Sequence, residues 1–347
     1  MEFRGRDGTR LAYQVIGEGR PVILIHGYMG RGAHWADSGI AGRLAGQGHR
    51  VIMPDMRGHG ESARPHDTAS YPPDVLAHDG LALIDHLGLT DYDLGGYSLG
   101  GRTVIRLLAR GATPRRAVVG GQGLDAVLHT AGRGGQYRKV LSGFGTFEPG
   151  SPEQQMEDWM RAGGSDPAAL LLVLDTFVNT TDEELAAIKT PVLILTGAED
   201  GHNATARALA EALPKGRYTE LPGNHLTAMT SPEFEKALAG FLAGDLNLSL
   251  KTSERSAIRV RLDEQVGMMG RRDLGVRAQP ALERVVAEAA MQDVMRGVAD
   301  SRGLLGVFVR QWHCVEGRVQ PGAQKKAIES RVPPGAHGRT RWGVATR

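Results

Sequence analysis

Short segments with the character of buried strands alternate along the first part of the chain with segments of helical spacing. The strand-like segments are residues 21–25, 51–55, 92–96, 117–119, 192–195 and 218–221. Helical patterns lie between them at residues 35–47, 73–87 and 98–110. Because apolar strands that alternate with helices are covered on both faces, this order predicts an α/β fold with a mostly parallel, doubly wound sheet.

Local signals mark both ends of this alternating region. Asp7 and Gly8 form a turn dipeptide between residues 3–4 and 11–15, which predicts an N-terminal β-hairpin. The last helix begins at Ser231, a good N-cap residue, followed by a proline that suits the first helical position. We expect this helix to end near Gly244.

The gap between the strands at 117–119 and 192–195 is far longer than one crossover helix. The sequences Ser-Pro-Glu-Gln at 151–154 and Thr-Asp-Glu-Glu at 181–184 both match a capping box, and residues 168–177 are apolar enough for a buried helix. The glycine-rich stretch 132–135 is the most loop-like part of the gap. We therefore predict a helical cap at residues 124–188, inserted into an α/β core of residues 1–123 and 189–244.

The alternation stops after residue 244. Residues 245–347 contain 18 basic and 11 acidic residues, whereas the preceding part contains 23 basic and 28 acidic residues. Residues 281–298 have helical spacing, but no second layer matches it. We expect a basic, Arg-rich and poorly ordered C-terminal extension, which is either a non-native extension of little function, a flexible interaction tail or a small accessory domain. Its arginines are scattered singly without a recognition motif, which argues against a nucleic-acid partner.

Composition narrows the class of protein further. Of 347 residues, 41% are hydrophobic and 23% are charged, which excludes a disordered or fibrous chain. No run of about 18 apolar residues exists, so we expect no membrane span. The polar N-terminus lacks the apolar core of a signal peptide, and the single Cys314 cannot form an internal disulfide. These features predict a cytoplasmic protein.

The strongest chemical signal is the sequence Gly-Tyr-Ser-Leu-Gly at residues 96–100, where a predicted strand ends and a helix begins. In this context Gly-x-Ser-x-Gly is a nucleophile elbow, whose tight turn exposes the Ser98 hydroxyl. The elbow lacks the Lys-Ser/Thr of a phosphate loop and the glycine spacing of a dinucleotide site. The histidines form no close ligand cluster. We therefore expect neither a cofactor nor a metal ion.

A serine nucleophile needs a base, and His225 lies in a Pro/Gly loop just beyond the last strand. Three other histidines have structural or pocket-lining interpretations; they are His26 at a strand end, His59 in a glycine-rich loop, and His202 beside the acid candidate. The base in turn needs a carboxylate, for which Asp200 after the strand 192–195 fits best. Glu199 and Asp125 remain alternatives. The order Ser98, Asp200, His225 is that of one hydrolase fold.

The oxyanion of a tetrahedral intermediate needs two backbone N–H donors. One is expected from Leu99, which follows the nucleophile at a helix N-terminus. The other is expected from Tyr28, in the loop after the first long strand, where Gly27 permits close approach. An ordinary glycine turn is the alternative interpretation of this loop.

Four segments together resemble the α/β-hydrolase family, in its short-cap, esterase-like branch. They are residues 26–28, 55–62, 96–100, and the pair formed by 197–200 and 223–225, in the order the family has them. The resemblance covers residues 1–244. It implies a mainly structural role for residues 55–62, so neither Asp55 nor Arg57 is assigned to catalysis. Related haloalkane dehalogenases and epoxide hydrolases use an aspartate at the elbow, and Ser98 argues against both.

The predicted function is hydrolysis of carboxylic esters of small to medium acyl chain by a Ser-His-Asp triad through an acyl-enzyme intermediate. Alternatives with the same triad are a lactonase, a C–C bond hydrolase and a cofactor-free perhydrolase; a catalytically silent ligand-binding member is a minor alternative. The partner is thus a small-molecule ester. Candidate pocket residues are apolar and favour an uncharged substrate: Tyr28, Tyr97, Trp159, Leu226 and Met229.

Overall fold

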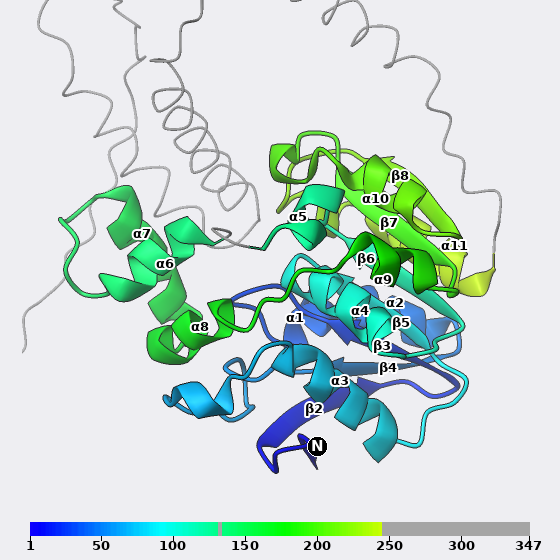
Figure 1. The fold of residues 1–347 in the computed structure, drawn as a ribbon, viewed down its shortest axis with the longest axis horizontal. Coiled ribbons are helices and arrows are strands. Elements are labelled where there is room, and N and C mark those ends of the chain that lie inside the picture. Colours follow the sequence, from blue (N-terminus) through cyan, green and yellow to red (C-terminus); the bar gives the residue numbers. More distant parts are fainter. Residues whose placement is uncertain (131–133, 245–347) are drawn as a thin grey trace, which may run out of the picture. The chain divides into compact units, whose positions relative to one another are not determined.

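The computed structural model describes residues 1–130 and 134–244 (Figure 1). Over these residues eight strands form one sheet in the order β1-β2-β4-β3-β5-β6-β7-β8. Strands β3 to β8 are parallel, and β2 is antiparallel to both of its neighbours. The strands are Glu2–Arg4 (β1), Arg10–Ile16 (β2), Arg20–Ile25 (β3), His49–Pro54 (β4), Asp93–Tyr97 (β5), Arg116–Gly120 (β6), Val192–Gly197 (β7) and Gly216–Leu221 (β8). The predicted mostly parallel α/β sheet is confirmed.

The N-terminal hairpin forms at the edge of this sheet. Phe3 of β1 pairs with Leu11 of β2. Gly8 takes a left-handed φ of 83° in the connecting turn, where a side chain would be strained. The Asp7 carboxylate accepts the Thr9 N–H at 3.0 Å. In the predicted turn dipeptide, Gly8 thus supplies the left-handed backbone and Asp7 supplies a side-chain hydrogen bond to the turn.

The central strands are buried on both faces, as their apolar sequences indicate. In β3, Ile23 and Ile25 face one hydrophobic layer, and Val22 and Leu24 face the other. Helices α3, α4, α9 and α10 pack on the first face, and α1, α2 and α11 pack on the second (Figure 1). Each fully buried aliphatic side chain contributes about 1.5–3 kcal/mol, so this two-sided burial accounts for most of the sheet's stability.

The helices follow the predicted order, with one split. The segment expected as a single helix at residues 35–47 forms two helices, because Gly39 between them has a left-handed φ of 78°. The last helix begins at Ser231, whose side chain accepts the Phe234 N–H, and ends at Gly244, as predicted. The helices are Ala33–Asp37 (α1), Ile40–Gly46 (α2), Val75–His86 (α3), Leu99–Ala109 (α4), Leu124–Leu128 (α5), Gly135–Ser142 (α6), Pro152–Ala162 (α7), Pro167–Leu174 (α8), Asp182–Ala187 (α9), Ala206–Ala212 (α10) and Pro232–Ala243 (α11), with 3-10 turns at Thr68–Ser70 (η1), Gly201–Asn203 (η2) and Ala228–Thr230 (η3).

Helices α6, α7 and α8 of the inserted region share a small hydrophobic core of their own. Its buried members are Val140, Leu141, Met156, Met160, Leu170 and Leu174. The outer helices of the insertion behave differently, since α5 packs against α10, and α9 packs against α4 and α10. The predicted capping box is complete at Thr181 and Glu184, whereas Ser151 caps α7 by accepting the Gln154 N–H. We use the word cap below for helices α6 to α8.

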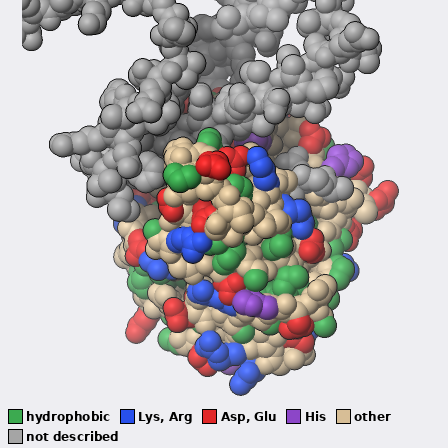
Figure 2. Space-filling model, turned by 90° about the vertical axis from the view of Figure 1, so that its left-hand side faces the viewer, with side chains coloured by type: hydrophobic (Ala, Val, Ile, Leu, Met, Phe, Trp, Pro, Cys, Tyr) green, Lys and Arg blue, Asp and Glu red, His purple; other side chains and the backbone are tan. Residues whose placement is uncertain are grey.

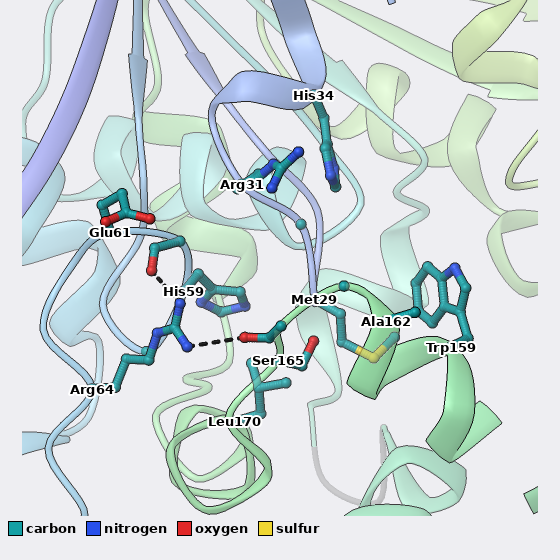
Figure 3. A pocket seen from close by; sticks show the side chains of 15 residues that line it. Met29, Arg31, His34, His59, Glu61, Arg64, Trp159, Ala162, Ser165 and Leu170 are labelled. Carbon is teal, nitrogen blue, oxygen red and sulfur yellow. Dashed lines mark hydrogen bonds between the residues drawn. The ribbon is translucent and has the colours of Figure 1, made fainter. Parts of the chain in front are cut away.

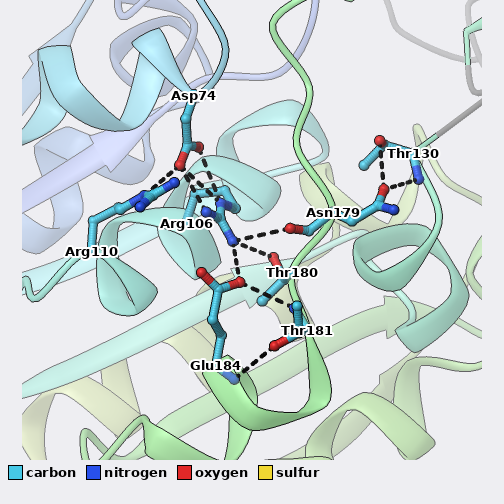
Figure 4. A network of polar contacts seen from close by, with 8 residues as sticks. All are labelled: Asp74, Arg106, Arg110, Thr130, Asn179, Thr180, Thr181 and Glu184. Atoms are coloured by element: carbon cyan, nitrogen blue, oxygen red, sulfur yellow. Dashed lines mark hydrogen bonds and ion pairs between the residues drawn. The ribbon is translucent and has the colours of Figure 1, made fainter.

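A buried ion-pair network joins the segment that follows the cap to helix α4 of the core (Figure 4). Arg106 of α4 donates to Asp74 at 2.8 Å and to Glu184 of α9 at 2.7 Å. The same guanidinium donates to the Asn179 carbonyl, and the Asn179 side chain accepts the Thr130 N–H. Both chain segments that lead to the cap are therefore fixed to α4.

The predictions for residues 245–347, including the helix at 281–298, and for residues 132–133 of the loop at 132–135 fall outside the described residues. No helix among the described residues is both long and apolar enough to span a membrane. On the face drawn in Figure 2, the basic and acidic side chains of the described residues are interspersed. Interspersed charges of both signs are typical of a solvated surface.

Candidate active site

Ser98 lies in the turn between β5 and α4, at the carboxyl edge of the sheet. Its backbone has φ 56° and ψ −117°, a strained combination for a residue other than glycine. The Ser98 N–H donates to the Gly120 carbonyl at 2.9 Å, and the Gln122 side chain donates to the Ser98 carbonyl at 2.8 Å. These two bonds, to the last residue of β6 and to the loop after it, hold the turn in place.

The two glycines of the elbow are required by close backbone packing. A Cβ on Gly100 would lie 2.1 Å from the Ile25 carbonyl oxygen, and a Cβ on Gly96 would lie 2.4 Å from the Gly100 carbonyl. Real Cβ atoms do not approach backbone so closely. The spacing Gly-x-Ser-x-Gly therefore reflects the close packing of α4 against β3 and β5.

The structure brings Ser98, His225 and Asp200 into one chain of hydrogen bonds. His225, in the loop after β8, has Nε2 3.0 Å from the Ser98 Oγ. Its Nδ1 lies 2.7 Å from Oδ2 of Asp200, which follows β7. Because β5, β7 and β8 are parallel, their carboxyl ends meet at one edge and deliver these three side chains to the same place.

Asp200 is suited to balance a positive charge on His225. Burial raises the pKa of its carboxyl, but the hydrogen bond and charge of His225 outweigh burial, so the pKa lies below its usual value. Asn203 donates to the same Oδ2 at 2.9 Å. The other oxygen, Oδ1, has no hydrogen-bond partner among the described residues. The carboxylate therefore stays ionised at neutral pH and points at the imidazole.

Tyr97 supports His225 from below. Its hydroxyl donates to the His225 carbonyl at 2.6 Å, and its ring packs against Phe234 of α11. Burial raises the pKa of Tyr97, so the hydroxyl remains protonated and can donate. Gly120 and Gly121 leave room for the ring, since a Cβ on either would lie 3.0 Å or less from it. Tyr97 was a candidate pocket residue in the sequence, and in the structure it packs against His225.

The other candidate bases and acids stand apart from this chain. Buried His26 uses both ring nitrogens, one toward the Gly27 carbonyl and one for the Met56 N–H, and burial lowers its pKa to about 4. His59 is also buried, and burial lowers its pKa to about 3. The remaining three alternatives are solvent-exposed: His202, Glu199 and Asp125.

The loop after β3 lies against the elbow. A Cβ on Gly27 would be 3.5 Å from the Ser98 Cβ, and the Gly30 N–H donates to the Gly27 carbonyl at 3.0 Å, which closes a β-turn. Leu99 is the first residue of α4. Among the described residues no acceptor is bonded to the backbone N–H of Tyr28 or Leu99. The Tyr28 hydroxyl donates to the Leu170 carbonyl at 2.8 Å, which ties this loop to the cap.

The segment 55–62 is structural in the way the family resemblance implies. Asp55 accepts the backbone N–H groups of Gly32 and Glu61, which joins the loops after β3 and β4. The Arg57 side chain is buried and donates to Asp79 and Asp7. Both side chains are thus occupied away from Ser98.

A cavity of about 370 Å³ lies between the cap and these two loops (Figure 3). Residues 29–34 and 58–64 form one side, and residues 159–165 and Leu170 of the cap form the other. Trp159, a candidate pocket residue, lines it. Of the other candidates, Met229 packs against the hydrophobic layer that contains α11, and Leu226 is exposed beside His225. The described residues contain no group of three His, Cys, Asp or Glu side chains that could hold a metal ion.

Comparison with known proteins supports the fold of this chain. A family model described as alpha/beta hydrolase fold matches residues 20–120. A non-heme haloperoxidase of Rhodococcus erythropolis is 31% identical over 225 residues, which cover 56% of this chain and 80% of that protein. The non-heme chloroperoxidase CPO-A1 of Kitasatospora aureofaciens is 38% identical over 110 residues, and this match spans 38% of that protein.

Solved structures resemble the same part of the chain. An esterase from a Rhodococcus species, RhEst1, superposes with a TM-score of 0.54 at 25% identity. The match covers 70% of this chain and 98% of the esterase. The part of the chain that carries Ser98, Asp200 and His225 therefore has the size and fold of a complete small hydrolase domain.

Proposed function

The chain belongs to the alpha/beta hydrolase fold family, and from that membership we propose that it is a serine hydrolase of carboxylic esters with small to medium acyl chains. The observation that carries the proposal is the hydrogen-bond chain from Ser98 through His225 to Asp200, with distances of 3.0 Å and 2.7 Å. Nucleophile, base and orienting carboxylate within hydrogen-bond reach are what acyl transfer by serine requires.

In the first half of the proposed reaction, Ser98 Oγ attacks the ester carbonyl carbon while His225 Nε2 takes the hydroxyl proton. The negative oxygen of the tetrahedral intermediate accepts the N–H groups of Tyr28 and Leu99, which no described acceptor occupies. The intermediate collapses, the C–O bond to the alcohol breaks, and His225 gives its proton to the leaving oxygen. Asp200 balances the imidazolium charge during these steps.

In the second half, water attacks the acyl-enzyme and His225 takes its proton. The bond between the acyl carbon and Ser98 Oγ breaks, and the proton returns to Ser98. The net reaction consumes one ester and one water and releases one acid and one alcohol. The strained Ser98 backbone keeps the hydroxyl exposed in both halves.

The test is hydrolysis of 4-nitrophenyl esters, from acetate to palmitate, by the protein and by Ser98→Ala. Activity on short acyl chains that disappears in the variant supports the proposal, and the chain length at which activity falls measures the acyl pocket. Labelling of Ser98 by a fluorophosphonate without any ester hydrolysis would contradict ester specificity in favour of lactones or C–C bonds. Absence of labelling would favour a silent ligand-binding protein.

A second candidate is perhydrolysis, which the similarity to the Rhodococcus haloperoxidase favours. In this reaction hydrogen peroxide replaces water as the nucleophile on the acyl-enzyme, and the product is a peracid that can oxidise a halide ion. The same residues would serve both reactions. Bromide oxidation that requires peroxide, a carboxylic acid and Ser98 would support it, and bromide oxidation by Ser98→Ala would contradict it.

A further inference from the structure

The loop after β3 runs from the proposed nucleophile to the cavity under the cap. A Cβ on Gly27 would lie 3.5 Å from the Ser98 Cβ, and Met29 and Gly30 line the cavity. Because Gly27 and Gly30 are the first and fourth residues of a β-turn, their Cα atoms are less than about 7 Å apart. Met29 within this turn has a left-handed φ of 60°, which is strained for its side chain. Ser98 and His225 do not line the cavity themselves, so the acyl chain of a substrate bound at Ser98 has to extend past this turn to enter it.

One wall of the cavity holds a positive charge that is paired with no carboxylate of the described residues. The Arg64 guanidinium donates to the Gly164 carbonyl of the cap at 2.9 Å and to the Gly60 carbonyl (Figure 3). Carbonyl oxygens orient a guanidinium but do not neutralise its charge. No ion pair joins Arg64 to a carboxylate in the part of the chain that the structure describes. The side chain is thus pre-organised, and its charge remains available to a ligand.

The remaining charged groups of the lining leave the cavity positive. Arg31 lies 3.6 Å from Asp37, and both side chains are more than half exposed, so this pair is weak. Glu61 is the one carboxylate among the lining residues and is solvent-exposed. Burial lowers the pKa of both His34 and His59, so these two rings are neutral near pH 7. The lining thus carries two positively charged arginines and one negatively charged, exposed glutamate.

We propose that this cavity binds a carboxylate at the far end of the substrate, so that the preferred esters are those of short dicarboxylic acids or of similar acids with a distal carboxylate. The inference rests on the proposed ester hydrolysis at Ser98 and deepens it. Arg64 and Arg31 supply the charge, and Trp159 and Leu170 of the cap supply apolar walls for the carbon chain. It replaces the uncharged substrate that the apolar candidate residues suggested.

The test compares two esters that differ at one end only. Monomethyl glutarate and methyl pentanoate have acyl chains of equal length, which end in a carboxylate and a methyl group respectively. Acid release is followed for both, and the ratio of their kcat/KM values is the readout. We expect the ratio to favour monomethyl glutarate in the wild-type protein.

Three variants and one control make the test specific. Arg64→Met lowers the ratio about tenfold or more, the amount expected for loss of a charged hydrogen bond, and Arg64→Lys restores part of it. Arg31→Gln lowers it less, about threefold, because that side chain is half exposed. The control is Arg20→Gln, an arginine of β3 that pairs with Asp91 on the surface. If Arg64→Met does not fold, the wild-type ratio must still fall as salt screens the charges.

An equal ratio in all variants, or a ratio independent of salt, would overturn the proposal. Inhibition by free glutarate distinguishes a subsite for the substrate from a separate anion site. Competitive inhibition of methyl pentanoate hydrolysis supports the subsite, whereas non-competitive inhibition indicates a separate anion site and overturns the proposal. Failure of the underlying ester hydrolysis has a different signature. Neither ester would react, while glutarate would still raise the melting temperature of the wild-type protein and not that of Arg64→Met.

Discussion

Among the described residues, the hydroxyl of Tyr97 makes one hydrogen bond, to the backbone of the proposed base His225, and its removal tests how that base is positioned. In Tyr97→Phe the ring keeps its packing against Phe234, and only the hydrogen bond to the His225 carbonyl is lost. That carbonyl belongs to the residue whose Nε2 must stay 3.0 Å from Ser98. The substitution therefore tests whether the backbone of the loop after β8 needs this support.

The structure sets the size of the effect. Tyr97 is 3% exposed and the bond is short, so its loss leaves a partly buried acceptor unsatisfied at a cost of about 1–3 kcal/mol. For a domain of this size, each kcal/mol lowers the melting temperature by about 2–4 °C. If roughly 1 kcal/mol of the cost falls on the alignment of His225, kcat falls about fivefold, since about 1.4 kcal/mol corresponds to tenfold. We expect KM to change little.

The assay is steady-state hydrolysis of a 4-nitrophenyl ester, together with thermal unfolding. The matched control is Tyr92→Phe, because Tyr92 is 2% exposed and precedes the opposite end of β5. Both variants lose a buried hydroxyl, but only Tyr97 contacts the base. We expect comparable losses of melting temperature and a loss of kcat confined to Tyr97→Phe.

Two results would refute this reasoning. Equal kcat values for the two variants would mean that the hydroxyl stabilises the fold without aligning His225. A change in KM with unchanged kcat would mean that Tyr97 acts on substrate binding, as the sequence first suggested.

Three further predictions concern the acid, the ion-pair network and the elbow. Asp200→Asn lowers kcat by about 10³-fold or more, whereas Glu199→Gln changes kcat little, because Glu199 is exposed and outside the hydrogen-bond chain. Equal losses of kcat in steady-state assays would contradict the assignment of Asp200 as the residue that orients His225. Burial raises the pKa of Asp74, but Arg106 and Arg110 outweigh it and lower the pKa below 3.8. The contribution of the ionised Asp74 to stability is therefore complete above about pH 4 and is lost as the pH falls through the pKa of the folded state. In denaturant unfolding, Asp74→Asn should have a free energy of unfolding about 3 kcal/mol lower at neutral pH, and this free energy should fall less steeply as the pH is lowered. Gly100→Ala prevents folding, since its Cβ would lie 2.1 Å from the Ile25 carbonyl oxygen. Gly42→Ala, on α2 where no atom lies close to the new Cβ, stabilises the fold by up to about 1 kcal/mol. Melting curves followed by circular dichroism that show the opposite order of stability would contradict the packing argument.

Much of the fold could be predicted from the sequence because its signals are local. Each central strand carries its apolar residues within a few positions, and burial on both faces made those runs visible without knowledge of their neighbours. The start of α11 followed from Ser231 and Pro232, and the elbow followed from the glycines around Ser98. The break at Gly39 was missed because a glycine inside an amphipathic pattern does not by itself show a left-handed φ.

Contacts between residues far apart in the sequence were not predictable in this way. The choice of Asp200 among three carboxylates depends on where β7 places its following loop relative to His225, 25 residues later. The role of Tyr97 under His225 joins residues 128 positions apart, and its apolar ring alone suggested a pocket residue. Asn203 and Gln122, which brace the acid and the elbow, carry no recognisable motif.

The sequence by itself thus determined the α/β class, the order of its elements and the elbow that carries the proposed nucleophile, because strand burial and the elbow depend on consecutive residues. The tertiary structure alone decided the hydrogen-bond partners of Ser98, the attachment of the segment after the cap to Arg106, and the position of Arg64 in the cavity wall. These depend on the packing of loops and helices that are distant in the chain. The hydrogen bonds and charge interactions of these residues form only when folding brings the distant segments together.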